Sequence, residues 1–252
     1  MQYKAHIKIG GVETFSSVDF PSHMSAAVFM QGCPWRCPFC YNTALQPTNA
    51  DTDFVWEKFY EFLKTRRGIL DAVVFSGGEP LMQDALLDAI DEVKALGYLA
   101  AVHTGGYRPG FFAEVLEKTD WVGFDIKAPL EEEKYNKAIG FKNTMSLRGG
   151  EADVAIPANS ILPNVLQSLD LLLKSNKNFE CRTTCDPNIL TIQDIYSIAD
   201  SLHARGVKNY HLQRYKPVKG NPADEFECDK FIQDKDLAAY LRAKFASSEL
   251  RS

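Results

Sequence analysis

The chain has 252 residues, of which 45% are hydrophobic and 24% are charged, and its formal net charge is −5 at pH 7. This composition is ordinary for a globular protein, and its charge gives no general attraction to nucleic acid or to an anionic membrane. No long apolar run opens the chain, and nowhere do 18 uncharged apolar residues follow one another, so no signal peptide or membrane span is predicted. We expect a cytoplasmic location, where thiols stay reduced.

Short apolar runs alternate with helical stretches along the chain. Six strands are predicted, at 26–32, 71–78, 98–106, 121–129, 179–187 and 209–217. Helices are predicted near 52–66, 83–96, 110–118, 131–138, 160–175 and 191–205, with a last one near 234–247. Capping residues precede three of these helices: Asp51 or Thr52, then Ser160, then Thr191.

A strand–helix order repeated six times predicts a parallel sheet with right-handed crossovers. Six units are too few for a closed eight-fold barrel, so the predicted fold is α/β, a partial (β/α)6 TIM-like barrel. A flat, doubly wound sheet remains the alternative. Because no linker-like segment interrupts the chain, a single domain over 1–252 is expected. It would have an N-terminal extension (1–24), a barrel core (about 25–217) and a helical tail (218–252).

Each predicted strand is followed by unusual polar or glycine-rich residues. Three cysteines follow the first strand, and the next strands are followed in turn by SGGEP, HTGG, DIK, RTTCDP and QRYKP. Active sites of parallel α/β folds form beyond the carboxyl ends of the strands. These segments are therefore expected to share one end of the sheet.

The three cysteines are Cys33, Cys37 and Cys40, in the stretch GCPWRCPFCYN. Clustered cysteines in a reducing compartment are usually metal ligands. Three thiolates can hold three irons of a 4Fe–4S cube and leave the fourth iron open to a chelating ligand. The alternatives are a zinc site that borrows a fourth ligand, for example His23, and buried structural thiols.

The spacing C-x-x-x-C-x-φ-C, with the aromatic Phe39 before the last cysteine, resembles the motif of the radical S-adenosylmethionine (SAM) enzymes. That family has a partial (β/α)6 barrel. The resemblance implies a 4Fe–4S cluster whose open iron binds the amino and carboxylate groups of SAM. It also implies that one electron from the cluster cleaves SAM to a 5′-deoxyadenosyl radical, which abstracts hydrogen from a substrate.

The segment SGGEP supplies a second match to the family. Gly77 and Gly78 allow the backbone to approach a ligand closely, and the carboxylate of Glu79 can accept a hydrogen bond from an ammonium group. The resemblance implies that this motif contacts the methionine amino group of SAM. Thr104, at the end of the third strand, is a further expected cofactor contact.

Other strand ends add candidates for cofactor binding. Asp125 and Lys127 point to the same side, and Lys127 either meets the SAM carboxylate or forms a surface ion pair. Arg182 either meets an anionic group or forms a structural salt bridge. Asn42 is placed to reach cofactor or substrate. His103 is interpreted as a hydrogen-bonded strand-end histidine, with a catalytic base as the alternative.

The remaining unusual residues fall on the last two strands and the tail. Gln213 and Tyr215 share a face of the sixth strand and are expected to line the pocket. Cys181, Cys185 and Cys228 are interpreted as buried free thiols, so no second cluster is predicted.

Residues 8–47 resemble one subgroup of the radical SAM enzymes in particular. The stretch from Asp19 to Pro21, followed by F-x-Q-G-C and C-x-x-C-Y-N, is similar to the activating proteins of anaerobic ribonucleotide reductase and pyruvate formate-lyase. This similarity implies an enzyme that places a radical on a glycine of a partner protein, with anaerobic ribonucleotide reductase as the expected partner. A flavodoxin or ferredoxin is the implied electron donor. The N-terminal hairpin is expected to lie beside the barrel mouth.

Two departures from these activating proteins leave alternatives open. Tyr41 stands where they usually have histidine, and His103 stands where the pyruvate formate-lyase type has an acidic residue near a monovalent cation. The first competing function is a radical SAM enzyme that acts on a small molecule, like the 7-carboxy-7-deazaguanine synthases. The second is a non-enzymatic iron–sulfur electron carrier, which would need a fourth fixed ligand and no SAM site.

Overall fold

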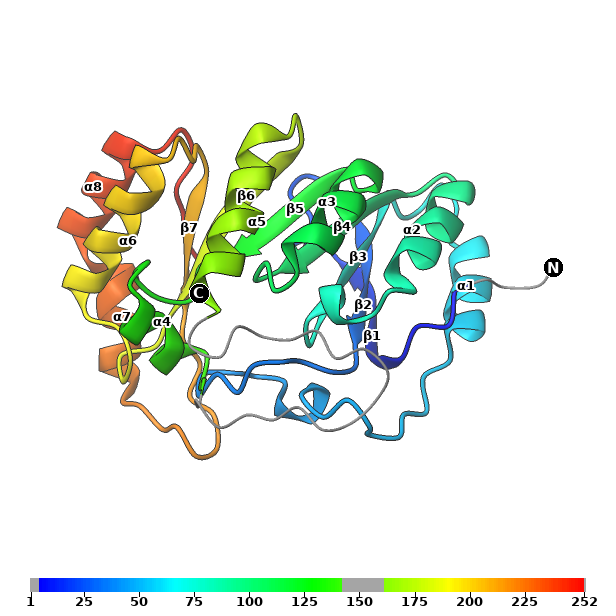
Figure 1. Cartoon of the computed structure of the whole chain (residues 1–252), viewed down its shortest axis with the longest axis horizontal. Helices are drawn as coiled ribbons and strands as arrows, with labels where there is room; N and C mark the ends of the chain where they lie inside the picture. Colours follow the sequence, from blue (N-terminus) through cyan, green and yellow to red (C-terminus); the bar gives the residue numbers. More distant parts are fainter. Residues whose placement is uncertain (1–4, 142–160, 252) are drawn as a thin grey trace. The chain divides into compact units, whose positions relative to one another are not determined.

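The computed structural model describes residues 5–141 and 161–251 (Figure 1). The chain divides into two compact units. Unit 1 comprises Met1–Pro34, Asn42–Asp125 and Gln167–Phe179, and unit 2 comprises Trp35–Tyr41, Ile126–Leu166 and Glu180–Ser252. The single-domain organisation expected from the sequence stays a prediction.

Unit 1 contains a sheet whose strand order follows the chain. Its strands are β1 (Ile9–Ser16), β2 (Ser25–Met30), β3 (Ala72–Gly77), β4 (Leu99–Thr104) and β5 (Trp121–Asp125). The first two strands are antiparallel, and each later strand pairs in parallel with the one before it. The parallel strands are almost wholly buried, which explains their continuous apolar sequences.

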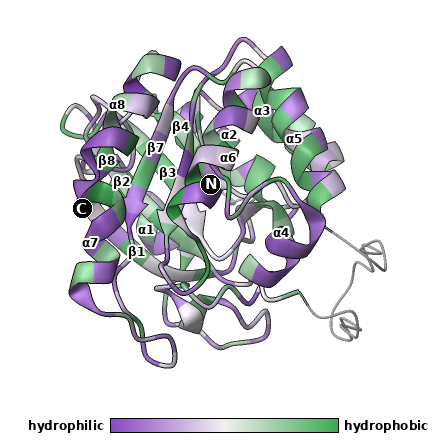
Figure 2. Cartoon of the chain, turned by 90° about the vertical axis from the view of Figure 1, so that its left-hand side faces the viewer, coloured by the Kyte–Doolittle hydropathy of each residue, from purple (hydrophilic) through white to green (hydrophobic). Residues whose placement is uncertain are grey.

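The helical elements of unit 1 connect these strands. They are η1 (Thr43–Leu45), α1 (Trp56–Lys64), η2 (Pro80–Met82), α2 (Leu86–Ala95) and α3 (Pro109–Lys118), and the later part of α5 (Leu162–Lys174) also belongs to this unit. The helices carry both hydrophobic and hydrophilic residues in Figure 2. In α3, for example, the buried side chains include Phe111, Phe112 and Val115. Their spacing gives the helix one apolar face.

The β1–β2 hairpin covers the amino-terminal halves of the parallel strands. Its Phe20 is 5% exposed and packs in a cluster with Ala27, Ala72, Ala101 and Trp121. Ala72 and Trp121 are the first residues of their strands, so this cluster lies toward the end of the sheet opposite to the polar strand ends. Phe20 thus packs toward that end, whereas β1 begins beside Met30 and Asp19 O meets His103 near the end of β4. The expectation that the hairpin lies beside the barrel mouth stays a prediction.

Unit 2 contains β6 from Glu180 onward, β7 and β8, which pair in parallel in that order. The bounds are β6 (Asn178–Cys185), β7 (Tyr210–Arg214) and β8 (Leu250–Arg251), and the helices are α4 (Glu132–Ala138), α6 (Ile192–Ala204), α7 (Glu225–Gln233) and α8 (Lys235–Lys244). All six predicted strands are thus present as β2 to β7. Strand β1 belongs to the expected N-terminal hairpin, and α7 lies in the expected helical tail, although neither was given bounds from the sequence. The two-residue strand β8 was not predicted.

The observed N-caps of the helices agree with the predicted ones only in part. Thr191 caps α6 with a complete capping box, as predicted. The first long helix begins at Trp56 after Val55, so the predicted caps Asp51 and Thr52 are wrong. Ser160 lies outside the described residues.

Candidate functional site

The three clustered cysteines follow the carboxyl end of β2. Cys33, Cys37 and Cys40 are each half-buried, and none of the three forms a disulfide bond. The backbone N–H of Cys40 donates to the carbonyl of Cys37 at 3.1 Å, which folds these two residues into a turn. Over residues 5–141 and 161–251, no three side chains of His, Cys, Asp or Glu form a metal-binding group, so the ligand role of the cysteines stays a prediction.

Cys181, Cys185 and Cys228 have a different environment. All three are fully buried. Burial raises the pKa of the Cys185 and Cys228 thiols, so both stay protonated at neutral pH. The interpretation of these three cysteines as buried thiols is therefore confirmed, and the expected absence of a second cluster stays a prediction.

In unit 1, the glycine-rich end of β3 is hydrogen-bonded to the backbone just before Cys33. Gly78 N–H donates to Met30 O, and Glu79 N–H donates to Gly32 O, both at 2.9 Å. A Cβ on Gly78 would lie 2.1 Å from Gly32 O, so only glycine permits this approach. Contact of these glycines with a ligand stays a prediction; the approach that the structure shows is to the cysteine loop's own backbone.

The carboxylate of Glu79 joins the ends of β3 and β4. The residue is 1% exposed. Its Oε1 accepts from Thr104 Oγ1 at 2.5 Å and from Leu81 N at 3.1 Å, while Oε2 accepts from Gly105 N at 3.0 Å. The structure therefore brings together two predicted site residues, Glu79 and Thr104. It also shows that backbone and hydroxyl donors stabilise the buried carboxylate.

Tyr107 is a residue of this region that sequence reasoning missed. It is 4% exposed, and burial raises the pKa of its phenol, with further upward contributions from Glu79 and Cys33. The phenol therefore lies within electrostatic reach of two predicted site residues. The available signal was its position directly after the HTGG segment.

The side chain of His103 has a structural role. Its Nε2 lies 2.8 Å from the carbonyl oxygen of Asp19, and its ring packs edge-on against Trp121. The ring is 7% exposed. The interpretation of His103 as a hydrogen-bonded strand-end histidine is therefore confirmed, and the bond ties the Asp19-Phe20-Pro21 segment to β4.

In unit 2, Lys127 packs against the aromatic side chains of the cysteine loop. Its Nζ lies 5.1 Å from the ring centre of Trp35 and 5.9 Å from that of Phe39, both within the range of a cation–π interaction. Lys127 and Phe39 were both predicted site residues, whereas Trp35 was missed. The Trp35 Nε1–H is buried and has no hydrogen-bond partner among the described residues.

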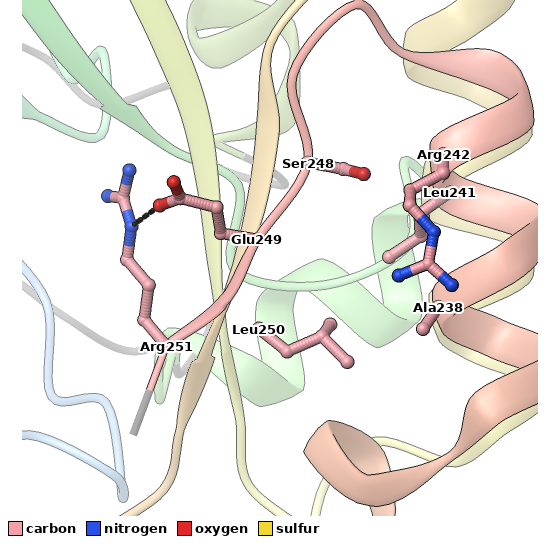
Figure 3. Close-up of a pocket in the computed structure, with 7 residues that line it drawn as sticks. All are labelled: Ala238, Leu241, Arg242, Ser248, Glu249, Leu250 and Arg251. Atoms are coloured by element: carbon pink, nitrogen blue, oxygen red, sulfur yellow. Dashed lines mark hydrogen bonds and ion pairs between the residues drawn. The ribbon is translucent and has the colours of Figure 1, made fainter.

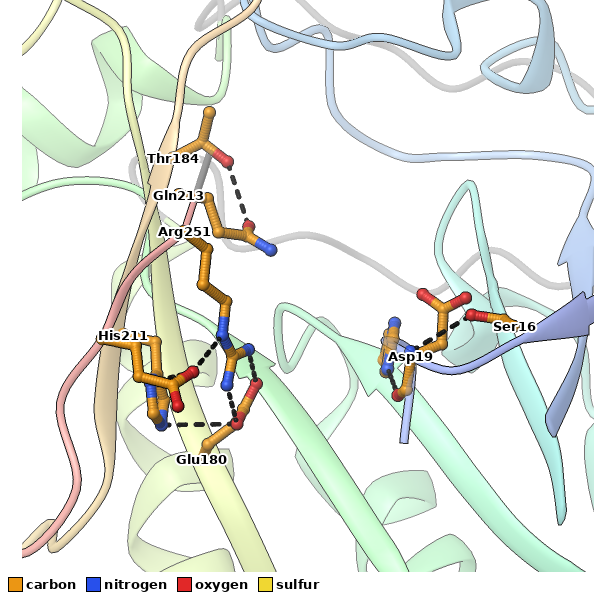
Figure 4. A network of polar contacts seen from close by, with 9 residues as sticks. Ser16, Asp19, Glu180, Thr184, His211, Gln213 and Arg251 are labelled. Atoms are coloured by element: carbon orange, nitrogen blue, oxygen red, sulfur yellow. Dashed lines mark hydrogen bonds and ion pairs between the residues drawn. The ribbon is translucent and has the colours of Figure 1, made fainter. Parts of the chain in front are cut away.

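The other predicted residues are placed as follows. Asn42 is exposed and precedes η1 without a side-chain cap, and Asp125 ends β5 half-buried. Arg182 is 8% exposed on β6, and its carbonyl accepts from Ile126 N. Gln213 accepts from Thr184 Oγ1 at 3.4 Å (Figure 4). Tyr215 is fully buried, and its expected place in the lining of the pocket stays a prediction.

Each unit has a pocket among its described residues that is lined by other side chains than those predicted for the site. In unit 2, a pocket of about 430 Å³ lies between α8 and the strand β8, and Arg242, Glu249 and Arg251 are among its lining residues (Figure 3). In unit 1, a pocket of about 250 Å³ lies beside β1 and α1 and is lined mainly by apolar side chains, including Phe54 and Phe62. Neither contains a predicted site residue.

The sequence of this chain is similar to a known protein family. Residues 27–148 match the family model of the Radical SAM superfamily. The chain carries a radical SAM domain. The matched range contains the three clustered cysteines, the SGGEP segment, Thr104, Asp125 and Lys127, whereas Arg182 lies beyond it.

Two curated relatives of this chain have related names. A Methanocaldococcus jannaschii protein named as a glycyl-radical enzyme activating enzyme is 29% identical over 214 residues, which is 83% of this chain and 80% of that one. The pyruvate formate-lyase-activating enzyme of Clostridium pasteurianum is 34% identical over 125 residues, which is 48% of this chain. That second match spans 52% of the relative, about half its length.

A solved structure confirms the fold of the radical SAM domain. The structure of anSMEcpe with bound AdoMet superposes with a TM-score of 0.61 at 16% identity, over 86% of this chain and 58% of that one. The predicted fold class, a partial TIM-like barrel of the radical SAM type, is therefore confirmed. Among the described residues, no helix is both long enough and apolar enough to cross a membrane.

Proposed function

We propose that this radical SAM enzyme cleaves S-adenosylmethionine reductively and generates a glycyl radical on a partner protein. The observation that carries the proposal is the similarity to the M. jannaschii activating enzyme, which extends over most of both chains. The expected partner is an anaerobic ribonucleotide reductase, and the expected electron donor is a flavodoxin or ferredoxin.

The residues present fit an iron–sulfur cluster. Cys33, Cys37 and Cys40 are reduced, half-buried thiols on one loop, which is the donor chemistry that such a cluster requires. The buried Trp35 N–H lacks a protein acceptor among the described residues and so remains available to a group held by this loop. These three cysteines would hold the cluster, which when bound supplies the electron for SAM cleavage and hence the radical chemistry.

The chain itself would orient the cofactor and shield it. Glu79 is fixed by Thr104 and Gly105, so the strand ends that would meet SAM are rigid before SAM binds. Lys127 lies against Phe39 and would place a positive charge near the SAM carboxylate. Asn42, Asp125 and Arg182 are further candidates for cofactor contacts.

The proposal is tested with anaerobically reconstituted protein, SAM and dithionite. We expect release of 5′-deoxyadenosine and, with a glycyl-radical enzyme added, an EPR doublet of a glycyl radical. Anaerobic ribonucleotide reductase and pyruvate formate-lyase are tested side by side as partners. Deoxyadenosine without a doublet on either would favour a small-molecule substrate, and a cluster that leaves SAM intact would favour an electron carrier.

The ligand assignment is tested by Cys37→Ala. Loss of one of three thiolates should abolish assembly of the 4Fe–4S cluster, measured as bound iron and sulfide and by the visible absorption spectrum. Cys228→Ala is the matched control, because that thiol is fully buried in α7 and should not bind iron. A Cys37→Ala protein with a full 4Fe–4S complement would refute the assignment.

A further inference from the structure

Tyr41 joins the cysteine loop to the end of β7. It directly follows Cys40, and its phenol donates to Arg214 O and accepts from Lys216 N–H, both at 3.0 Å. Its ring stacks on that of the intervening residue, Tyr215, with the ring centres 6.4 Å apart and the planes 17° from parallel. One side chain therefore binds the backbone on both sides of Tyr215.

The end of β7, to which Tyr41 is hydrogen-bonded, is itself held in place by other contacts. Tyr215 is fully buried, and its hydroxyl donates to Asn221 O at 2.5 Å and accepts from Val218 N–H at 3.3 Å. The Arg214 guanidinium forms ion pairs with Asp229, at 2.5 Å, and with Glu225, both in α7. The end of β7 thus has little freedom to follow Tyr41 if the loop moves.

The opposite end of the loop has its own attachment within unit 2. Arg36 N–H donates to Ile139 O at 2.8 Å. Gly140, with a φ of +65°, packs so closely that a Cβ there would lie 2.2 Å from Arg36 O. Residues 36–41 are therefore held near both ends, and Tyr41 provides the attachment next to Cys40.

The phenol of Tyr41 acts as a donor and as an acceptor at the same time. It donates to Arg214 O and accepts from Lys216 N–H. A phenylalanine would keep the ring and its stacking on Tyr215 but would lose both hydrogen bonds.

We propose that Tyr41 is a positioning residue whose phenol holds Cys40, and with it the Cys37–Cys40 turn, in the arrangement that binds the cluster. This inference rests on the proposed function, because it assigns a task to Tyr41 in the same site. The Cys40 N–H bond to Cys37 O carries the constraint from Tyr41 to the second thiol. Tyr41, which departs from the histidine usual in activating proteins, thereby gains a specific role.

The test compares Tyr41→Phe with wild type and with Tyr240→Phe. Tyr240 is the matched control, because its hydroxyl donates to Asp200 elsewhere in unit 2 and it lies on α8, far along the chain from the cysteine loop. Tyr41 is 48% exposed and the replacement keeps its ring, so the variant should fold. Its thermal midpoint is measured first.

The decisive readouts are spectroscopic and do not require turnover. In Tyr41→Phe we expect iron release to a chelator to be about five- to 150-fold faster, the range that corresponds to the loss of two hydrogen bonds. We also expect an altered EPR spectrum of the reduced cluster. In the cluster-free protein, hydrogen exchange of the Lys216 amide should accelerate, since its acceptor is gone. Tyr240→Phe should match wild type in all three measurements.

The outcomes distinguish failure of the positioning role of Tyr41 from failure of the proposed function. A wild-type protein that takes up no 4Fe–4S cluster would overturn both. A wild-type protein with a cluster, and a Tyr41→Phe protein with unchanged iron release and EPR spectrum, would overturn only the positioning role. Faster Lys216 exchange alone would then show that the bonds are real but purely structural.

Discussion

At the carboxyl end of β3, Gly78 lies against the peptide that precedes Cys33. The contact is between backbone atoms, and the neighbouring Glu79 N–H donates to Gly32 O at 2.9 Å. The side chain of Glu79 then reaches Thr104 and Gly105 on the next strand. Single residues at these strand ends therefore fix one another before they meet any ligand, which is the condition for a preorganised site.

Gly78→Ala should disturb the start of the cysteine loop. A Cβ at this position would lie 2.1 Å from Gly32 O, a backbone atom that cannot rotate away, so the loop must shift. We expect a loss of about 1–3 kcal/mol in the free energy of unfolding, measured by urea denaturation, as for other overpacked sites. Reconstituted Gly78→Ala should also hold less iron than wild type.

Gly110→Ala is the matched control for this experiment. It lies in the first turn of α3, and a Cβ there would meet nothing within 4 Å. Alanine is the better helix former, so this variant should be as stable as wild type or more stable. Equal effects at the two glycines would show that the contact with Gly32 is unimportant.

At the scale of elements, helix α6 shows how local sequence can define a boundary. Thr191 Oγ1 accepts from Asp194 N–H, and the Asp194 carboxylate accepts from Thr191 N–H in return. Lys134 of α4 forms an ion pair with the same Asp194 at 2.9 Å. The start of α6 is thus fixed both by its own sequence and by a neighbouring helix.

Thr191→Ala should lower the free energy of unfolding by about 0.5–2 kcal/mol, the usual effect of removing an N-cap. The loss arises because a backbone N–H of the first turn loses its acceptor. Ser201→Ala, within the same helix, is the control and should leave stability nearly unchanged. If both variants unfold at the same urea concentration as wild type, the cap contributes nothing measurable.

At the scale of the whole molecule, buried charges make stability depend on pH. In unit 2, His211 is 3% exposed, with Nε2 3.4 Å from Glu180 and Nδ1 3.6 Å from Glu249 (Figure 4). Arg251 binds both carboxylate oxygens of Glu180, at 2.6 and 3.0 Å. Burial lowers the pKa of His211 in spite of the nearby Glu180, so the folded protein holds this imidazole neutral.

The free energy of unfolding should therefore fall as the pH drops below about 6.5, the ordinary pKa of histidine. In that range the unfolded chain binds a proton that the folded chain resists, and one such proton changes stability by up to about 1.4 kcal/mol per pH unit. The loss continues until the lowered pKa of His211 is reached. The hydrogen bond from Arg251 lowers the pKa of Glu249, which adds a further loss in more acidic solution.

Urea denaturation between pH 7.5 and 5 measures this slope. His211→Asn should flatten it, even if the variant is less stable overall, because the titrating group is gone. His203→Asn replaces an exposed histidine at the end of α6 and serves as the control. A slope that is the same in wild type and His211→Asn would assign the pH dependence to other groups.

The sequence by itself determined the features that depend on local chemistry. Short apolar runs predicted the six strands β2 to β7, and several of these runs are almost continuously apolar because the strands are covered on both faces. The hydroxyl and carboxylate of Thr191 and Asp194 defined the start of α6. The cysteine spacing and the SGGEP segment indicated the radical SAM domain, because their chemistry is carried by a few residues close together in the chain.

Only the tertiary structure decided the contacts between residues far apart in sequence. Phe20 packs on alanines of three strands, Glu79 accepts from residues 25 and 26 positions later, and Tyr41 reaches backbone 173 and 175 positions away. The two-residue strand β8 forms only because β7 offers it an edge. Local propensity carries no information about such partners, since they are set by how the chain packs and not by the residues on either side.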